Sequence, residues 1–226
     1  MNIEQNIKEI QAQITELKPN NEVNLIAVSK NFPVTAIEKA YQSGQRRFGE
    51  NYVQEFAAKA EKLHDLDIEW HFIGSIQSNK TKIIAKFADW VHTLTKYTHA
   101  KRLNDQRPLE CQPLKVLIEV NISNEDSKHG LDNFAQIHEL AIQIQQLPNL
   151  KLVGLMGMAA NSHDTNLIQQ QFLQLSNYLD QLNQHGFELT QLSMGMSQDY
   201  PLAIKAGANL IRIGSKIFGE RNYDNN

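Results

Sequence analysis

Residues 23–51 read VNLIAVSKNFPVTAIEKAYQSGQRRFGEN, and this stretch carries the pattern that decides the fold. An apolar run at 23–29 predicts a buried strand, and the amphipathic segment 33–43 predicts a helix that ends at Gly44. A second short run, 47–50, follows the helix and predicts another strand, although it is short and carries charge. Strand, helix and strand in this order form the unit of a parallel sheet.

The same alternation continues along the rest of the chain. Further strands are expected at 69–74, 90–94, 115–122, 150–158, 189–195 and 210–214. Helices are expected between them, at 52–63, 80–87, 98–105, 132–146, 165–185 and 200–206. An additional N-terminal helix is predicted by apolar residues at helical spacing, namely Ile3, Ile7, Ile10, Ile14 and Leu17. Eight strand-helix units predict an α/β fold, a single (β/α)8 barrel domain that takes up residues 1–226.

A doubly wound open sheet is the competing topology. Such a sheet usually has a glycine-rich turn after its first strand, whereas here the strand runs into Ser29-Lys30-Asn31-Phe32-Pro33. No linker or low-complexity tract divides the chain. We therefore expect one closed barrel.

Composition excludes several classes of partner. The chain has 22 Lys and Arg against 25 Asp and Glu, a net charge of -3, so it offers no global field for a nucleic acid. No apolar run approaches the ~18 residues of a membrane span. The single Cys111 has no partner for a disulfide, which favours a cytoplasmic location, and the His and Cys residues show no metal-binding spacing. We expect no nucleic acid, membrane or metal as a partner.

Polar residues at the carboxyl ends of the predicted strands are the candidates for a site, because that end of a parallel barrel carries the chemistry. Lys30 follows the first strand directly. A lysine at the mouth of an apolar strand can be partly desolvated, which favours its neutral amine as a nucleophile towards aldehydes. The alternative is a solvated lysine on a loop.

Two neighbouring turns are candidates for binding a phosphate. The segment 193–197, SMGMS, precedes a predicted helix, and Gly214-Ser215 follows the eighth strand. Small hydroxyl residues and backbone N–H groups are what a phosphate monoester requires, and barrels often bind phosphate after strands seven and eight. The alternative for the first turn is an ordinary helix cap beside core methionines.

Two further residues lie inside predicted strands. A guanidinium at Arg212 pointing into the barrel needs a partner, which a ring nitrogen of a ligand or a carboxylate such as Glu50 could supply. If Arg212 instead points outward, its role is structural. His71 lies between Trp70 and Phe72 and is interpreted as a hydrogen-bonded core residue.

Taken together, these motifs closely resemble the pyridoxal phosphate homeostasis protein family. The segments that carry the resemblance are 27–30 (AVSK), 48–55 (FGENYVQE), 71–74 (HFIG), 77–80 (QSNK), 193–199 (SMGMSQD) and 212–219 (RIGSKIFG). The resemblance implies a pyridoxal 5′-phosphate (PLP) binding barrel similar to the N-terminal domain of alanine racemases. The sequence departs from the family at residues 157–160 and at Ile76, which we expect at the rim of the sixth and third loops.

The resemblance also implies roles for individual residues. Lys30 is implied as the Schiff-base lysine, Arg212 as the partner of the pyridine nitrogen, and Asn51 as a residue of the cofactor pocket. Ser197, Gly214 and Ser215 are implied as the phosphate-binding residues, and Lys128 as a further lysine near the site.

The resemblance leaves two functions open. One is a non-catalytic protein that buffers PLP and delivers it to apo-enzymes, and the other is an amino-acid racemase or related PLP enzyme with an open site. Arginine at position 212 cannot accept a proton from the pyridine nitrogen, which weakens carbanion chemistry but does not forbid it, since the racemases that the chain resembles work with arginine there. The eight units also take up nearly all of the chain, and racemases use a further domain. We therefore expect a carrier with no catalytic residues.

Overall fold

A closed barrel of eight parallel strands forms the centre of the computed structural model, which describes residues 2–18, 22–123, 125 and 129–219. The strands are hydrogen-bonded in chain order and β8 returns to pair with β1. They are β1 (Asn24–Val28), β2 (Arg47–Glu50), β3 (Glu69–Phe72), β4 (Trp90–Leu94), β5 (Leu114–Val120), β6 (Leu150–Gly157), β7 (Gln191–Ser193) and β8 (Leu210–Ile213). The barrel confirms the predicted topology, including the short second strand.

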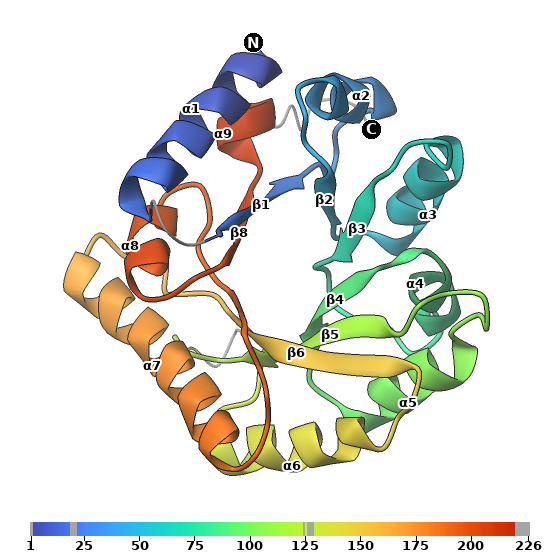
Figure 1. Ribbon diagram of the computed structural model, residues 1–226, viewed down its shortest axis with the longest axis vertical. Helices are drawn as coiled ribbons and strands as arrows, with labels where there is room; N and C mark the ends of the chain where they lie inside the picture. The colour runs from blue at the N-terminus through green and yellow to red at the C-terminus, as the bar shows by residue number, and fades with distance from the viewer. Residues whose placement is uncertain (1, 19–21, 124, 126–128, 220–226) are drawn as a thin grey trace.

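Helices surround the barrel on the outside, as Figure 1 shows. They are α1 (Ile3–Leu17), α2 (Val34–Gln42), α3 (Val53–Lys62), α4 (Thr81–Phe87), α5 (Tyr97–Gln106), α6 (Phe134–Gln145), α7 (Thr165–Gln184), α8 (Tyr200–Lys205) and α9 (Ser215–Phe218). The single-turn helix α9 was not predicted, because four residues are too few to show periodicity. Its position after β8 matters for the site.

Helix α1 lies beside α8 and α9 in Figure 1. Its buried face consists of Ile7, Ile10 and Ile14, three of the predicted apolar positions. The side-chain amide of Asn6 donates to the carbonyl of Ile217 at 2.9 Å, which ties α1 to α9. The N-terminal helix is thus part of the outer ring and supports the turn after β8.

The hydrophobic core has two layers. The larger one lies between the strands and the helices, and a small cluster of Ile26, Trp90, Leu117, Met156 and Leu210 fills the barrel interior. Because side chains alternate along a strand, residues two positions from these also point inward. Several of those interior positions are polar, and they become important below.

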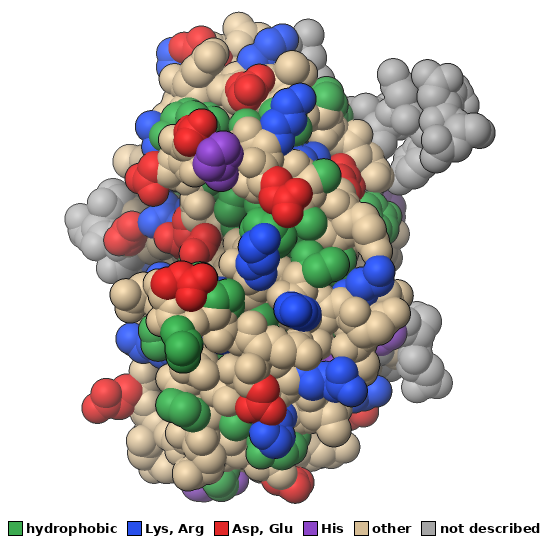
Figure 2. All heavy atoms as spheres, turned by 90° about the vertical axis from the view of Figure 1, so that its right-hand side faces the viewer, with side chains coloured by type: hydrophobic (Ala, Val, Ile, Leu, Met, Phe, Trp, Pro, Cys, Tyr) green, Lys and Arg blue, Asp and Glu red, His purple; other side chains and the backbone are tan. Residues whose placement is uncertain are grey.

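The surface carries charges of both signs. Figure 2 shows Lys and Arg side chains interspersed with Asp and Glu over the face on the right of Figure 1. Among the described residues, none of the helices combines the length and apolarity that crossing a bilayer requires.

Candidate functional site

A cavity of about 620 Å³ opens at the carboxyl ends of the strands. Its lining includes all six residues predicted for the site: Lys30, Asn51, Ser197, Arg212, Gly214 and Ser215. The apolar part of the wall includes Val28, Ile73, Met156 and Met158. The fold therefore brings together residues that lie up to 185 positions apart in the chain at one end of the barrel.

Lys30 is half-buried at the end of β1, and the residues on both sides of it are fixed by hydrogen bonds. The Ser29 hydroxyl donates to Oε1 of Glu50 at 2.6 Å, and the backbone N–H of Asn31 donates to Oε1 of Glu55 at 2.7 Å. Asn31 has a left-handed φ of 64°, a conformation that asparagine tolerates better than most residues. This local geometry sets the direction in which Lys30 leaves the strand.

A buried lysine holds this arrangement together. Nζ of Lys59, on α3, lies 2.7 Å from Oε1 of Glu50, from Oε1 of Glu55 and from the carbonyl oxygen of Ser29. Burial raises the pKa of the Glu50 carboxyl, against the opposing effect of Lys59. Glu50 was considered as a partner of the Arg212 guanidinium. The structure corrects this, because Glu50 bonds to Lys59 and Ser29 instead.

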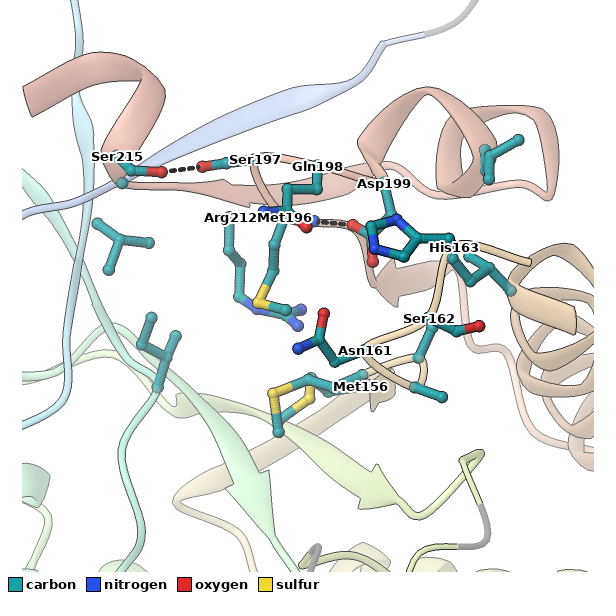
Figure 3. Close-up of a pocket in the computed structure, with 18 of the residues that line it drawn as sticks. Met156, Asn161, Ser162, His163, Met196, Ser197, Gln198, Asp199, Arg212 and Ser215 are labelled. Atoms are coloured by element: carbon teal, nitrogen blue, oxygen red, sulfur yellow. Dashed lines mark hydrogen bonds between the residues drawn. The ribbon is translucent and has the colours of Figure 1, made fainter. Parts of the chain in front are cut away.

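Arg212 points into the barrel, which is one of the two orientations that the sequence left open. Nη1 donates to the Ser193 hydroxyl oxygen at 2.6 Å, and Nη2 donates to the carbonyl of Gly157 at 3.2 Å. Burial lowers the pKa of Arg212 to about 10, so the guanidinium remains charged at neutral pH. Figure 3 shows this group projecting into the cavity near Met196 and Asn161. It is a fixed cation with N–H groups left to bind a ligand.

The turns after β7 and β8 meet at one edge of the cavity. The hydroxyl of Ser215 donates to that of Ser197 at 3.0 Å, as the dashed line in Figure 3 shows. Ser215 is the first residue of α9, where backbone N–H groups have no intrahelical acceptor. The two hydroxyls and this helix start lie together where the sequence predicts an anion site. Ser193 is not part of it, because its side chain is buried and bonded to Arg212.

Gly195 shapes the first of these turns. Its φ is +92°, and a Cβ atom there would lie 2.6 Å from Cβ of Ala203 and 2.9 Å from Cα of Tyr200. Only glycine therefore lets the turn pass this close to α8. The packing sets the position of Ser197, two residues later.

Asn51 lies on the loop after β2, at the cavity wall. Its side-chain oxygen is buried and has no hydrogen-bond partner among the described residues. The loop after β3 passes so close that a Cβ on Gly74 would lie 1.9 Å from the Asn51 carbonyl. Asn51 thus presents a fixed acceptor that a ligand could use.

Sequence reasoning missed much of the loop after β6. Asn161, Ser162 and His163 from this loop line the cavity, opposite the serine turn, as Figure 3 shows. Gln171 fixes the loop by accepting from the backbone N–H of Ala160 at 2.8 Å. These positions carry no motif by themselves, and only the position of the loop at the mouth of the barrel could have indicated them.

Other predictions near the site have mixed outcomes. Residues 158–160 line the cavity as expected, but Ile76 does not and packs against the core instead. His71 is the buried, hydrogen-bonded residue that was expected. Lys128 lies outside the described residues. In the described part of the chain, no group of three or more His, Cys, Asp or Glu side chains is placed to hold a metal ion.

Comparison with known sequences assigns a family. The model of the alanine racemase N-terminal domain matches residues 1–222. A pyridoxal phosphate homeostasis protein of Vibrio alginolyticus is 50% identical over 230 residues, covering 98% of each chain. The protein of the same name from Escherichia coli strain K12 is 44% identical over 205 residues, which covers 89% of this chain and 87% of that one.

Solved structures agree with these matches. PipY of Synechococcus elongatus with PLP bound has a TM-score of 0.86 and 36% identity, over 96% of this chain and all of that one. An alanine racemase from Corynebacterium glutamicum has a TM-score of 0.70 at 16% identity, which shows a shared fold. This chain covers 60% of that racemase.

Proposed function

Because the chain belongs to the pyridoxal phosphate homeostasis protein family, we propose that it binds PLP in the cavity and acts in cytoplasmic PLP homeostasis. In this role it holds the cofactor and passes it to apo-enzymes that depend on PLP. The observation that carries the proposal is the convergence of Lys30, Arg212 and the serine pair on one cavity of about 620 Å³. PLP offers each of them a matching group.

The residues present fit PLP group by group. The paired hydroxyls of Ser197 and Ser215, at the start of α9, suit the phosphate. The charged Arg212 can donate to the pyridine nitrogen, which is an acceptor. The unpartnered side-chain oxygen of Asn51 can accept from a donor on the ring. Apolar side chains of Val28, Met156 and neighbouring residues suit the flat faces of the ring.

PLP supplies an aldehyde, which a lysine amine can attack to form a C=N bond with loss of water. Lys30 is the residue that we assign to this bond. The chain of hydrogen bonds from Lys59 through Ser29 and Glu55 fixes the backbone on both sides of Lys30. An amine held in this way is oriented before the cofactor arrives, which lowers the entropy cost of attachment.

The environment of Arg212 favours holding the cofactor over catalysis. A deep electron sink requires a protonated pyridine nitrogen, usually beside a carboxylate. Arg212 is charged and is fixed by its bonds to Ser193 and Gly157. Because a guanidinium has no acceptor, it can only donate to the pyridine nitrogen and leaves that nitrogen without a proton. A neutral ring stabilises a carbanion weakly, which favours binding of the cofactor over turnover.

The proposal is tested by loading the protein with PLP and removing the excess. The wild type should retain PLP with the visible absorption band of a lysine adduct, whereas Lys30→Ala should lose that band. Lys96→Ala is the matched control, since Lys96 also follows a strand but does not line the cavity. The loaded protein should also restore activity to an apo-enzyme. Robust formation of D-amino acids from L-amino acids would support the racemase instead.

A further inference from the structure

A continuous chain of polar groups crosses the barrel interior below the cavity. Nε2 of His71 lies 3.2 Å from Oε1 of Glu69, and Nδ1 of His71 lies 2.9 Å from Nε2 of His92. Nδ1 of His92 lies 2.8 Å from the Ser193 hydroxyl, which is 2.6 Å from Nη1 of Arg212. Five residues from β3, β4, β7 and β8 thus form a chain that runs from Glu69 to Arg212 at the cavity.

The proton positions in this chain follow from its first member. Burial raises the pKa of the Glu69 carboxyl, but the contact with His71 and the charges of Lys115 and Arg47 together bring it down to about 2. Glu69 is therefore a carboxylate at neutral pH and can only accept. Nε2 of His71, 3.2 Å from this carboxylate, therefore carries the proton that faces it, in a charge contact whose angle is not that of an aligned hydrogen bond.

The remaining steps follow in order. Burial lowers the pKa of both His71 and His92, so each ring is neutral and has one donor and one acceptor. Nδ1 of His71 therefore accepts from Nε2–H of His92. Nδ1 of His92 then accepts from the Ser193 hydroxyl, whose oxygen accepts from Arg212. Every donor in the chain points towards Glu69.

The two ends of the chain reach different surfaces. Arg212 lines the cavity at the carboxyl ends of the strands. Glu69 lines a second cavity of about 560 Å³ at the amino ends, and its side chain is 31% exposed. His71, His92 and Ser193 between them are fully buried. Glu69 is thus a partly exposed member of the chain at the amino ends of the strands. Substitution of Glu69 removes its charge without disturbing the buried core.

We propose that Glu69 is a positioning residue for Arg212. Its charge fixes the direction of the hydrogen bonds, so that the Ser193 hydroxyl donates to His92 and its oxygen faces Nη1 of Arg212, which holds the guanidinium in one orientation towards the cavity. The effect on a bound cofactor rests on the proposed function, but the direction of the chain does not. Loss of the charge would let both histidine rings switch their protonated nitrogen, and Ser193 would then accept from His92 as well as from Arg212.

The direct test uses nitrogen NMR of the histidine rings in the protein without cofactor. In the wild type, both His71 and His92 should be neutral with the proton on Nε2. Glu69→Gln should move at least one of them, in part or fully, to the Nδ1–H form. Asp67→Asn is the matched control, because Asp67 lines the same second cavity two residues away and should leave both rings unchanged. A charged His92 in the wild type, or unchanged rings in Glu69→Gln, would overturn the proposal.

A second test uses the PLP-loaded protein. Glu69→Gln should shift the absorption band of the bound cofactor and weaken PLP binding by up to about tenfold, because Arg212 keeps its bond to Ser193 and loses only its single orientation. Asp67→Asn should do neither. Ser193→Ala breaks the same chain nearer to Arg212 and should reproduce both effects. If Ser193→Ala changes the band and Glu69→Gln does not, Glu69 has no positioning role.

The two tests keep the proposals separate. If the wild type does not bind PLP at Lys30, the proposed function fails, but the NMR test still decides the direction of the chain. If PLP binds and Glu69→Gln leaves its band and affinity unchanged, the positioning role is wrong and the proposed function stands. Urea unfolding of each variant shows whether it is folded under the conditions used.

Discussion

Nζ of Lys59 lies 2.7 Å from Oε1 of Glu50, and both side chains are buried beneath the loop that carries Lys30. The same ammonium group binds Glu55 and the Ser29 carbonyl, so one cation holds three acceptors from three elements. A buried ion pair contributes little net stability, but loss of one partner leaves a charge without compensation. The cluster therefore acts mainly by fixing the backbone around Lys30.

Lys59→Met should destabilise the protein by roughly 3–5 kcal/mol, because it leaves Glu50 buried without its cation. Urea unfolding measures this change. Lys62→Met, on the exposed side of the same helix, is the control and should leave the unfolding midpoint unchanged. Addition of Glu50→Gln to Lys59→Met should recover part of the loss. An unchanged midpoint in Lys59→Met would contradict the structural role.

Two glycines with nearly the same backbone angle allow a matched test of the turn before Ser197. Gly195 has φ +92° and no room for a Cβ, whereas Gly186 has φ +91° and nothing within 4 Å. Gly186→Ala should cost about 1–2 kcal/mol for the left-handed backbone alone. Gly195→Ala should cost more and should also weaken PLP retention. Equal losses of stability in the two variants would show that the close approach to α8 is unimportant.

His92 should make stability depend on pH below about 6.5. Its folded pKa is lowered well below 6.5 by burial, so above that value both states are neutral and the stability is fully present. As the pH falls, the unfolded state binds a proton that the folded state refuses, and stability is lost by up to about 1.4 kcal/mol per pH unit. His71 contributes in the same direction.

The measurement is the free energy of unfolding at about pH 7.5 and about pH 5.5, above the range in which carboxyl groups titrate in the unfolded chain. His92→Gln should reduce the difference between the two values. A difference as large as in the wild type would assign the pH dependence to other groups.

The serine pair should contribute to binding the phosphate. Ser197→Ala and Ser215→Ala should each weaken PLP binding by about 1.5–3 kcal/mol, the size of a hydrogen bond to a charged group. The binding of pyridoxal, which has no phosphate, should change little in either variant. Ser162→Ala, on the opposite side of the cavity, is the control. A loss of affinity that is the same for pyridoxal and PLP would place the phosphate elsewhere.

Much of the fold could be predicted from the sequence, because apolar runs and helical spacing report directly on a closed parallel barrel. The six candidate residues could be located for the same reason, since each lies near the carboxyl end of a strand. The direction of Arg212 could not be predicted. The alternation of side chains fixes two faces for each strand, but which face points inward depends on the register of the neighbouring strands.

Other features arise only from contacts between distant residues. Nothing in the sequence near His92 indicates that its ring bonds to Ser193, 101 positions away. Lys59 lies within the predicted third helix, and its charge would ordinarily indicate a solvated surface. The sequence also does not show that Ser193, at the start of the predicted 193–197 turn, turns its hydroxyl into the interior and bonds to Arg212. Such interior polar networks become visible only when the barrel closes.

The central claim is that Lys30 binds PLP covalently, and borohydride reduction tests it most directly. The PLP-loaded protein is reduced, digested and analysed by mass spectrometry, which locates the lysine that carries the reduced cofactor. We expect the adduct on the peptide that contains Lys30, and no adduct at that site in Lys30→Ala. An adduct on another lysine of the wild type, or no adduct at all in protein that retains PLP, would contradict the account.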